Sequence, residues 1–221
     1  MRVTVVTFPG SNCDRDVQRA FSDKLGCHVI KAWHEDSSLA ETDAVILPGG
    51  FSYGDYLRTG AMAARAQLMP AIKAFAERGG PVLGICNGFQ ILCEAQLLDG
   101  ALLRNESLGF ICEDVRVSVE ADDTLWTRGL KGKEFTLPIA HGDGNYFAEE
   151  ATLDALEKEG RVVLRYEARN PNGSCRRIAA ISNKARNVVG LMPHPERASD
   201  ELIGGTDGLL FLGGLLRGAA K

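Results

Sequence analysis

Pro81-Val82-Leu83-Gly84-Ile85-Cys86-Asn87-Gly88 decides the fold, because it joins a buried strand directly to a helix. Apolar residues predict a strand over 81–85 and a helix over 88–98. The glycines two places before and two places after Cys86 leave room for a sharp turn between the two elements. This G-x-C-x-G pattern is the cysteine version of the nucleophile elbow, whose central side chain stands at the carboxyl end of a parallel sheet.

Strands and helices alternate before this turn. Apolar runs predict strands over 2–8, 27–33 and 44–47. Helices are expected after a cap at Ser11 or Asn12 and over 60–78, and each is ended by glycine. Such alternation predicts an α/β fold, with an open, mostly parallel sheet and helices on both faces.

The second half of the chain has a different pattern, with several strands and little helix between them. Strands are expected over 109–119, 133–138, 161–167, 176–182 and 187–192. These segments predict an antiparallel extension of the same sheet, and a last helix is expected over 207–217. No repeat or low-complexity linker interrupts the sequence, so we expect one domain over residues 1–221.

Composition excludes some classes of function. The 221 residues carry 25 Lys and Arg against 29 Asp and Glu, a net charge of −4, which is too little positive charge for binding nucleic acid through its phosphates. No segment approaches the ~20 apolar residues of a membrane span, and the N-terminal residues lack the long apolar stretch of a signal peptide. We therefore expect a cytoplasmic protein that contacts neither nucleic acid nor membrane.

Six cysteines are present, and none forms a C-x-x-C pair, so the sequence predicts no metal site. Free cysteines usually pack as small apolar residues. Cys86 is the exception, since a helix begins directly after it, and a helix N-terminus favours the thiolate form of cysteine. Cys86 is the candidate nucleophile, and a core cysteine flanked by glycines is the alternative.

His194 and Glu196 are the candidate partners of Cys86. They follow an apolar run and flank Pro195, and in an extended segment they would point to the same side, where the carboxylate orients the imidazole. A solvated loop in which Pro195 begins a helix is the alternative. The loop Gly49-Gly50 also follows a strand, and with the N–H of Asn87 it can supply an oxyanion hole, unless it is an ordinary β-turn.

Together these motifs resemble those of class I, triad-type glutamine amidotransferases. Residues 84–90 are similar to the family motif G-x-C-x-G-x-Q, and His194-Pro195-Glu196 is similar to its H-P-E. Longer blocks at 8–14, 48–58, 192–197 and 204–208 are similar to the small, separate-chain glutaminase subunits of purine synthesis. The resemblance covers nearly the whole chain and implies the family's flavodoxin-like fold.

The resemblance also implies a chemistry and a set of residues. Cys86, His194 and Glu196 would hydrolyse glutamine through a glutamyl thioester. Gly50, Phe51 and Asn87 would frame the oxyanion hole, and Gln90 would help to hold the substrate. His141 lies in an H-G-x-G segment that could face a partner, and residues 174–186 depart most from the family pattern.

Partners are implied as well. The family's overall reaction consumes ATP, yet the sequence has no G-x-x-x-x-G-K-[ST] phosphate loop. ATP and Mg²⁺ are therefore expected on a large synthetase subunit, with a small bridging subunit beside it, and no cofactor is expected in this chain. Ammonia at pH 7 is mostly protonated, so it should reach that subunit by a sheltered path.

Three alternatives remain open at this point. A glutaminase for another acceptor would select a different partner chain. A stand-alone thiol hydrolase or peptidase would act without any partner. A non-enzymatic interaction module would keep its function after Cys86→Ala, and its Cys86 would react with alkylating agents no faster than Cys93.

Overall fold

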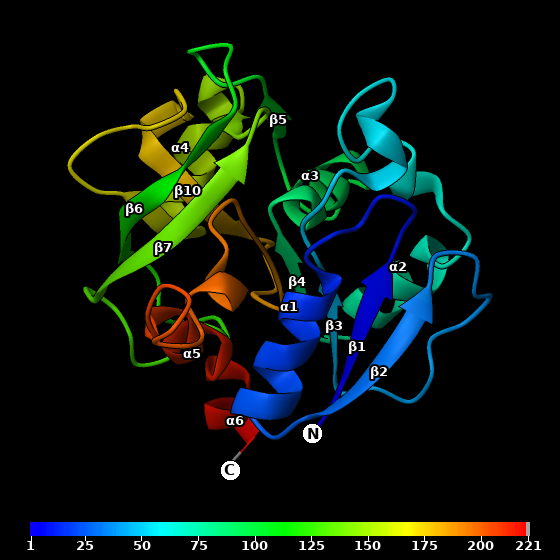
Figure 1. Cartoon of the computed structure of the whole chain (residues 1–221). Coiled ribbons are helices and arrows are strands. Elements are labelled where there is room, and N and C mark those ends of the chain that lie inside the picture. The colour runs from blue at the N-terminus through cyan, green and yellow to red at the C-terminus, as the bar shows by residue number, and fades with distance from the viewer. Residues whose placement is uncertain (220–221) are drawn as a thin grey trace.

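The computed structural model describes residues 1–219, and a nine-stranded sheet forms the centre of this part (Figure 1). Its strands are β1 (Arg2–Thr7), β2 (His28–Trp33), β3 (Ala44–Leu47), β4 (Val82–Ile85), β6 (Ile111–Val119), β7 (Glu134–His141), β9 (Val162–Tyr166), β10 (Ile178–Ser182) and β11 (Val188–Leu191). They lie in the order β2-β1-β3-β4-β11-β10-β9-β6-β7. The short strands β5 (Ala101–Leu103) and β8 (Asn145–Phe147) pair separately.

The sheet has a parallel and an antiparallel half. Strands β2, β1, β3, β4 and β11 pair in parallel. From β11 outward, each neighbouring pair through β10, β9, β6 and β7 is antiparallel. The predicted parallel sheet with an antiparallel extension is therefore confirmed.

Helices cover both faces of the sheet. They are α1 (Asp14–Arg19), α2 (Met69–Glu77), α3 (Asn87–Glu94), α4 (Glu150–Lys158), α5 (Asp207–Leu212) and α6 (Gly214–Ala219). Figure 1 shows α1 and α5 on the near side and α2 and α4 behind the sheet. Strands β3, β4 and β11 are buried at every position, which is why they are continuous apolar runs in the sequence.

The prediction of one long helix over 60–78 is wrong for the first half of that range. Only α2 forms there, after a short 3-10 turn at Ala63–Arg65 and an extended residue, Ala66, with ψ 153°. Pro70 explains the break, because a proline inside a helix lacks the N–H donor and clashes with the carbonyl four residues earlier. At the second position of α2, where that N–H needs no partner, it is tolerated.

Two further helix boundaries differ from the predictions, and one helix was not predicted. Cys13, rather than Ser11 or Asn12, is the N-cap residue of α1, and the Ser11 hydroxyl instead accepts the N–H of Phe8 at 3.0 Å. Helix α4 was not predicted, because among its residues only Leu153 and Leu156 are buried. The last helix divides at Gly213 into α5 and α6.

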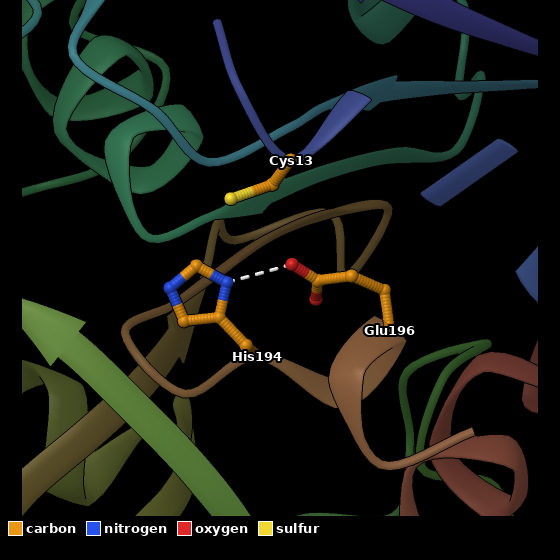
Figure 2. Close-up of side chains that lie close together, drawn as sticks. All are labelled: Cys13, His194 and Glu196. Carbon is orange, nitrogen blue, oxygen red and sulfur yellow. Dashed lines mark hydrogen bonds and ion pairs between the residues drawn. The ribbon is translucent and has the colours of Figure 1, made fainter. Parts of the chain in front are cut away.

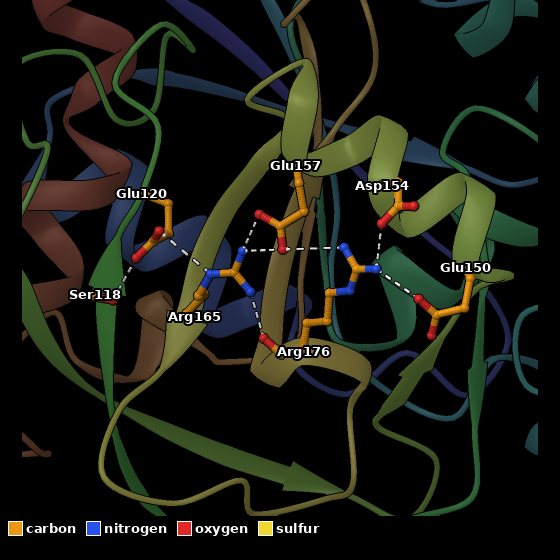
Figure 3. Close-up of polar contacts among 7 residues, drawn as sticks. All are labelled: Ser118, Glu120, Glu150, Asp154, Glu157, Arg165 and Arg176. Atoms are coloured by element: carbon orange, nitrogen blue, oxygen red, sulfur yellow. Dashed lines mark hydrogen bonds and ion pairs between the residues drawn. The ribbon is translucent and has the colours of Figure 1, made fainter.

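The turn at 175–177, in the segment expected to depart from the family pattern, is held by charges within the chain (Figure 3). Arg176 pairs with Glu150 at 2.7 Å and with Asp154 at 2.6 Å, both on α4. Arg165 on β9 pairs with Glu157 at 2.6 Å and donates to the carbonyl of Arg176 at 2.5 Å. Arg176 therefore fastens the turn at 175–177 to α4, and Arg165 fastens the same turn to β9.

No helix within residues 1–219 is long and apolar enough to span a membrane.

Candidate active site

The candidate residues meet at one edge of the sheet, where strands β1, β3, β4 and β11 end. Parallel strands present their carboxyl ends at the same edge, so the loops that follow them converge. These loops carry Cys13, Gly50, Cys86 and His194, and all four line one pocket of about 250 Å³. Pockets for drug-sized ligands are typically ~300–1,000 Å³, so this one suits a smaller molecule.

Cys86 occupies a strained turn between β4 and α3. Its φ of 51° and ψ of −105° lie far from helical or extended values. A Cβ at Gly88 would lie 2.0 Å from the carbonyl oxygen of Leu47, and one at Gly84 would lie 2.5 Å from the carbonyl oxygen of Gly88. Both glycines are thus required by close backbone contact, and the elbow forms as predicted, with Cys86 as the N-cap residue of α3.

His194 and Glu196 form a buried pair. Nδ1 of His194 lies 2.6 Å from Oε1 of Glu196, and each residue is 1% exposed (Figure 2). The sequence predicted an extended segment here, but Pro195–Arg197 forms a 3-10 turn. Pro195 does begin a helical turn, and the turn brings the carboxylate to the imidazole. Among the residues described, Nε2 of His194 has no hydrogen-bond partner and can exchange protons with a ligand.

Electrostatics favour a charged imidazole in this pair. Burial by itself lowers the pKa of His194, but the negative charges of Glu196 and Cys86 outweigh it and raise that pKa well above its usual range. The buried carboxylate of Glu196 thus favours the protonated form of His194. An imidazolium is then available as a general acid, oriented by Glu196.

A chain of amide side chains ties the elbow to two other loops. The Asn87 side chain accepts the N–H of Ser52 at 3.2 Å and donates to Oε1 of Gln90 at 2.8 Å. Gln90 in turn donates to the carbonyl of Asp143 at 2.7 Å. Gln90 is 5% exposed, so here its side chain joins the elbow to the 141–144 loop rather than facing the pocket.

Two of the predicted oxyanion donors are free in this structure. Within residues 1–219, the backbone N–H groups of Gly50 and Asn87 donate to no protein group. The N–H of Phe51 is already used, because it donates to the carbonyl of Gly10 at 3.0 Å. Phe51 still lines the pocket, where its ring lies 6.4 Å from that of Phe110.

The His141 side chain is buried and faces the interior, while a partner contact at the H-G-x-G segment stays a prediction. Its Nδ1 lies 3.0 Å from Oδ1 of Asn105, and Nδ2 of Asn172 lies 3.5 Å from its Nε2. Burial, and secondarily the charge of His194, lowers the pKa of His141 to about 4. A neutral imidazole here braces the loop that accepts the Gln90 side chain.

We expect His141→Gln to flatten the acid dependence of stability. A pKa near 4 in the folded chain against 6.5 in the unfolded chain gives stability that is complete above pH 6.5 and is lost as the pH falls through 4. The wild-type protein should lose about 3 kcal/mol of unfolding free energy over this range through His141, at up to about 1.4 kcal/mol per pH unit. Urea unfolding between pH 7 and pH 4 measures it, and equal slopes for both proteins would contradict the assignment.

The sequence interpretation missed Cys13 as a member of this site. Its sulfur accepts from Nη2 of Arg197 at 3.0 Å and lies within 4.8 Å of ligand atoms of His194 and Glu196 (Figure 2). The sequence analysis made Cys86 the one exception among the cysteines, and Cys13 is a second cysteine with polar partners. The available signal was its place after β1, since loops after parallel strands share one edge.

Comparisons with known proteins agree with this geometry. Residues 1–204 match the model of the CobB/CobQ-like glutamine amidotransferase domain. The chain is 60% identical to the phosphoribosylformylglycinamidine synthase subunit PurQ of Rubrobacter xylanophilus, over 99% of both chains. It is 54% identical to PurQ of a Nostoc species, over 98% of this chain and 97% of that one. Among solved structures, a chain of PurLQS from Thermotoga maritima superposes with a TM-score of 0.91 at 48% identity, covering 99% of this chain and 98% of that chain.

Proposed function

This chain belongs to the CobB/CobQ-like glutamine amidotransferase family, and on that premise we propose that it is the glutaminase subunit of a phosphoribosylformylglycinamidine synthase. As one glutamine amidotransferase type 1 domain over residues 1–221, it would hydrolyse glutamine to glutamate and ammonia. The observation that carries the proposal is the meeting of Cys86, His194 and Gly50 in one pocket, in a chain 60% identical to a PurQ subunit.

The proposed reaction begins with attack of the Cys86 sulfur on the side-chain amide carbon of glutamine. The carbonyl oxygen becomes an oxyanion, which the N–H groups of Asn87 and Gly50 stabilise. His194 gives its Nε2 proton to the leaving nitrogen, the C–N bond breaks, and ammonia departs from a glutamyl thioester.

Water completes the cycle. Neutral His194 takes a proton from water as the oxygen attacks the thioester carbon. The C–S bond then breaks, glutamate leaves, and Cys86 is again a thiolate beside an imidazolium. Glu196 keeps Nδ1 of His194 protonated throughout, so that Nε2 alone carries the transferred proton.

Ammonia would pass to a PurL-type synthetase subunit, which converts formylglycinamide ribonucleotide (FGAR) to formylglycinamidine ribonucleotide (FGAM) with ATP in de novo purine synthesis. The name PurLQS of the similar structure supports a PurL partner, and a small PurS-type subunit is proposed to bridge the chains. ATP and Mg²⁺ are assigned to the synthetase. Phe51 and Phe110, which are 43% and 57% exposed, present apolar surface at the mouth of the pocket.

We expect Glu196→Gln to lower kcat for glutamine by roughly 10³–10⁴-fold, because a neutral amide neither fixes the tautomer of His194 nor stabilises its charge. The pKa of His194 should fall in the variant, which would shift the pH–rate profile to lower pH. Steady-state kinetics across pH tests this. Glu201→Gln, which alters an exposed carboxylate, is the control, and an unchanged profile in Glu196→Gln would contradict the role.

The isolated chain should show little glutaminase activity, and the synthetase should switch it on. Ammonia released to water at pH 7 is mostly protonated and unreactive, so hydrolysis without an acceptor would waste glutamine. The test compares glutamate release by the chain alone with release by the chain plus PurL-type and PurS-type subunits, FGAR and ATP. High turnover of the chain alone would contradict the coupling, and no response to these subunits would contradict the proposed partner.

A further inference from the structure

A second sulfur, that of Cys13, lies against the catalytic pair of His194 and Glu196. Ligand atoms of Cys13, His194 and Glu196 all lie within 4.8 Å of one another, and all three residues are buried. Figure 2 shows the Cys13 sulfur near the His194–Glu196 hydrogen bond, above the imidazole ring. The three ligands come from two loops that β1 and β11 hold at the same sheet edge.

The donor set is one that zinc prefers. A thiolate sulfur, an imidazole nitrogen and a carboxylate oxygen suit a borderline-soft ion in a tetrahedral site, whereas Mg²⁺ and Ca²⁺ require oxygen ligands. A thiolate and a carboxylate also balance the charge of a divalent ion, which allows its burial. The Arg197 guanidinium, 3.0 Å from the sulfur, donates to it and can do so when the sulfur is a metal ligand.

Glu196 has one carboxylate oxygen that is free to bind a metal ion. Its Oε1 contacts His194, while its Oε2 is buried and has no hydrogen-bond partner among the residues described. A buried carboxylate oxygen without a donor is costly, and a bound cation would relieve that cost. Cys13 and His194 both line the pocket, so a water molecule there would be the fourth ligand.

We propose that Cys13, His194 and Glu196 form a zinc-binding site, and that zinc bound there blocks glutamine hydrolysis. The ion would bind Nδ1 of His194 in place of the proton now shared with Glu196. Metal–ligand bonds of ~2.0–2.1 Å require the nitrogen and oxygen to be roughly 3.3 Å apart, so the present 2.6 Å pair must open by under 1 Å.

Zinc on Nδ1 of His194 would inhibit glutamine hydrolysis, because the same ring must transfer a proton at Nε2. This inference of inhibition rests on the proposed function. Zinc on Nδ1 would displace the hydrogen bond to Glu196 that orients the imidazole, and Nε2 would then no longer pass a proton to the leaving nitrogen. Zinc would thus compete with a proton for the catalytic base without touching Cys86.

The test measures metal binding to the full chain carrying Cys86→Ala, which removes the nucleophile and with it any site between Cys86 and Nε2. Calorimetry should show one zinc ion per chain. Co²⁺ as a substitute should give the intense absorption of tetrahedral coordination and a sulfur-to-cobalt charge-transfer band. Adding Cys13→Ser should weaken zinc binding at least ~100-fold, beyond the 10–100-fold typical of losing an outer partner of a ligand, and should abolish the charge-transfer band.

Controls make each outcome decisive. Cys112→Ser removes another thiol that lines the pocket and should leave zinc affinity unchanged. Should Cys13→Ser fail to fold, Glu196→Gln in the same background should give the same loss of affinity. Unchanged affinity after Cys13→Ser, or zinc binding that requires Cys86, would overturn the proposal. If the variant binds zinc in this way but the wild-type chain, in complex with a synthetase, hydrolyses no glutamine, the site would be supported and only the proposed function contradicted.

Discussion

Cys86→Ala should lower glutamine-dependent FGAM formation by the complex at least ~10⁴-fold, because Cys86 is the pocket thiol that stands on the elbow beside the oxyanion donors. Formation of FGAM from added ammonium salt should persist, since that route bypasses the glutaminase. Steady-state assays of the complex with each nitrogen source measure both. The variant should also fold normally, because alanine removes one sulfur from a turn whose shape is set by Gly84 and Gly88.

Cys112→Ser is the matched control for the nucleophile. Cys112 lines the same pocket but lies on β6, away from any helix N-terminus, and it is exposed. Its loss should leave the glutamine-dependent rate within a few-fold of wild type. Glutamine hydrolysis that survives Cys86→Ala would mean that another nucleophile acts, and the proposed mechanism would fail.

Gly88→Ala should destabilise the protein by more than ~4 kcal/mol, among the larger effects of single substitutions. The added Cβ would lie 2.0 Å from the carbonyl oxygen of Leu47 and 3.0 Å from the Cβ of Leu47. Both atoms belong to β3, which is buried between β1 and β4 inside the sheet, so neither can move aside cheaply. Chemical denaturation should show the loss, and glutaminase activity should fall with it because the elbow is displaced.

Gly109→Ala separates this contact from the general effect of adding a methyl group. A Cβ at Gly109 would meet its nearest neighbour, the Ser107 hydroxyl, at 3.8 Å, which is ordinary contact. The substitution should change stability by less than ~1 kcal/mol, and restriction of the unfolded chain could even raise it. Equal effects at both glycines would show that the close approach of α3 to β3 is unimportant.

The parallel half of the fold could be predicted because its signals are local. Buried strands such as β3 and β4 are continuous apolar runs, and the glycines around Cys86 mark the sharp turn between β4 and α3. The prediction of a helix over 60–78 was wrong before Met69, because Pro70 prevents the helix from extending toward the N-terminus despite the apolar composition around it. Helix α4 was not predicted from the sequence, because only two of its residues, both leucines, are buried in the core.

The site was predictable as far as neighbouring residues define it. His194 and Glu196 are two residues apart, so their contact could be inferred even though the backbone between them is a 3-10 turn rather than extended. The contact of Cys13 with Arg197 joins residues 184 positions apart, and the bond between Asn105 and His141 spans 36. Contacts of that kind depend on which strands become neighbours, and no local pattern encodes them.

The measurement that tests the central claim most directly is covalent labelling with a glutamine analogue that carries an electrophilic carbon in place of the side-chain amide. The full chain, in complex with its synthetase, is treated with the analogue, digested and mapped by mass spectrometry, with excess glutamine as competitor. A single adduct on Cys86 that glutamine suppresses is the predicted result. An adduct on another cysteine, or no adduct that glutamine suppresses, would contradict the assignment of Cys86 as the nucleophile of a glutaminase.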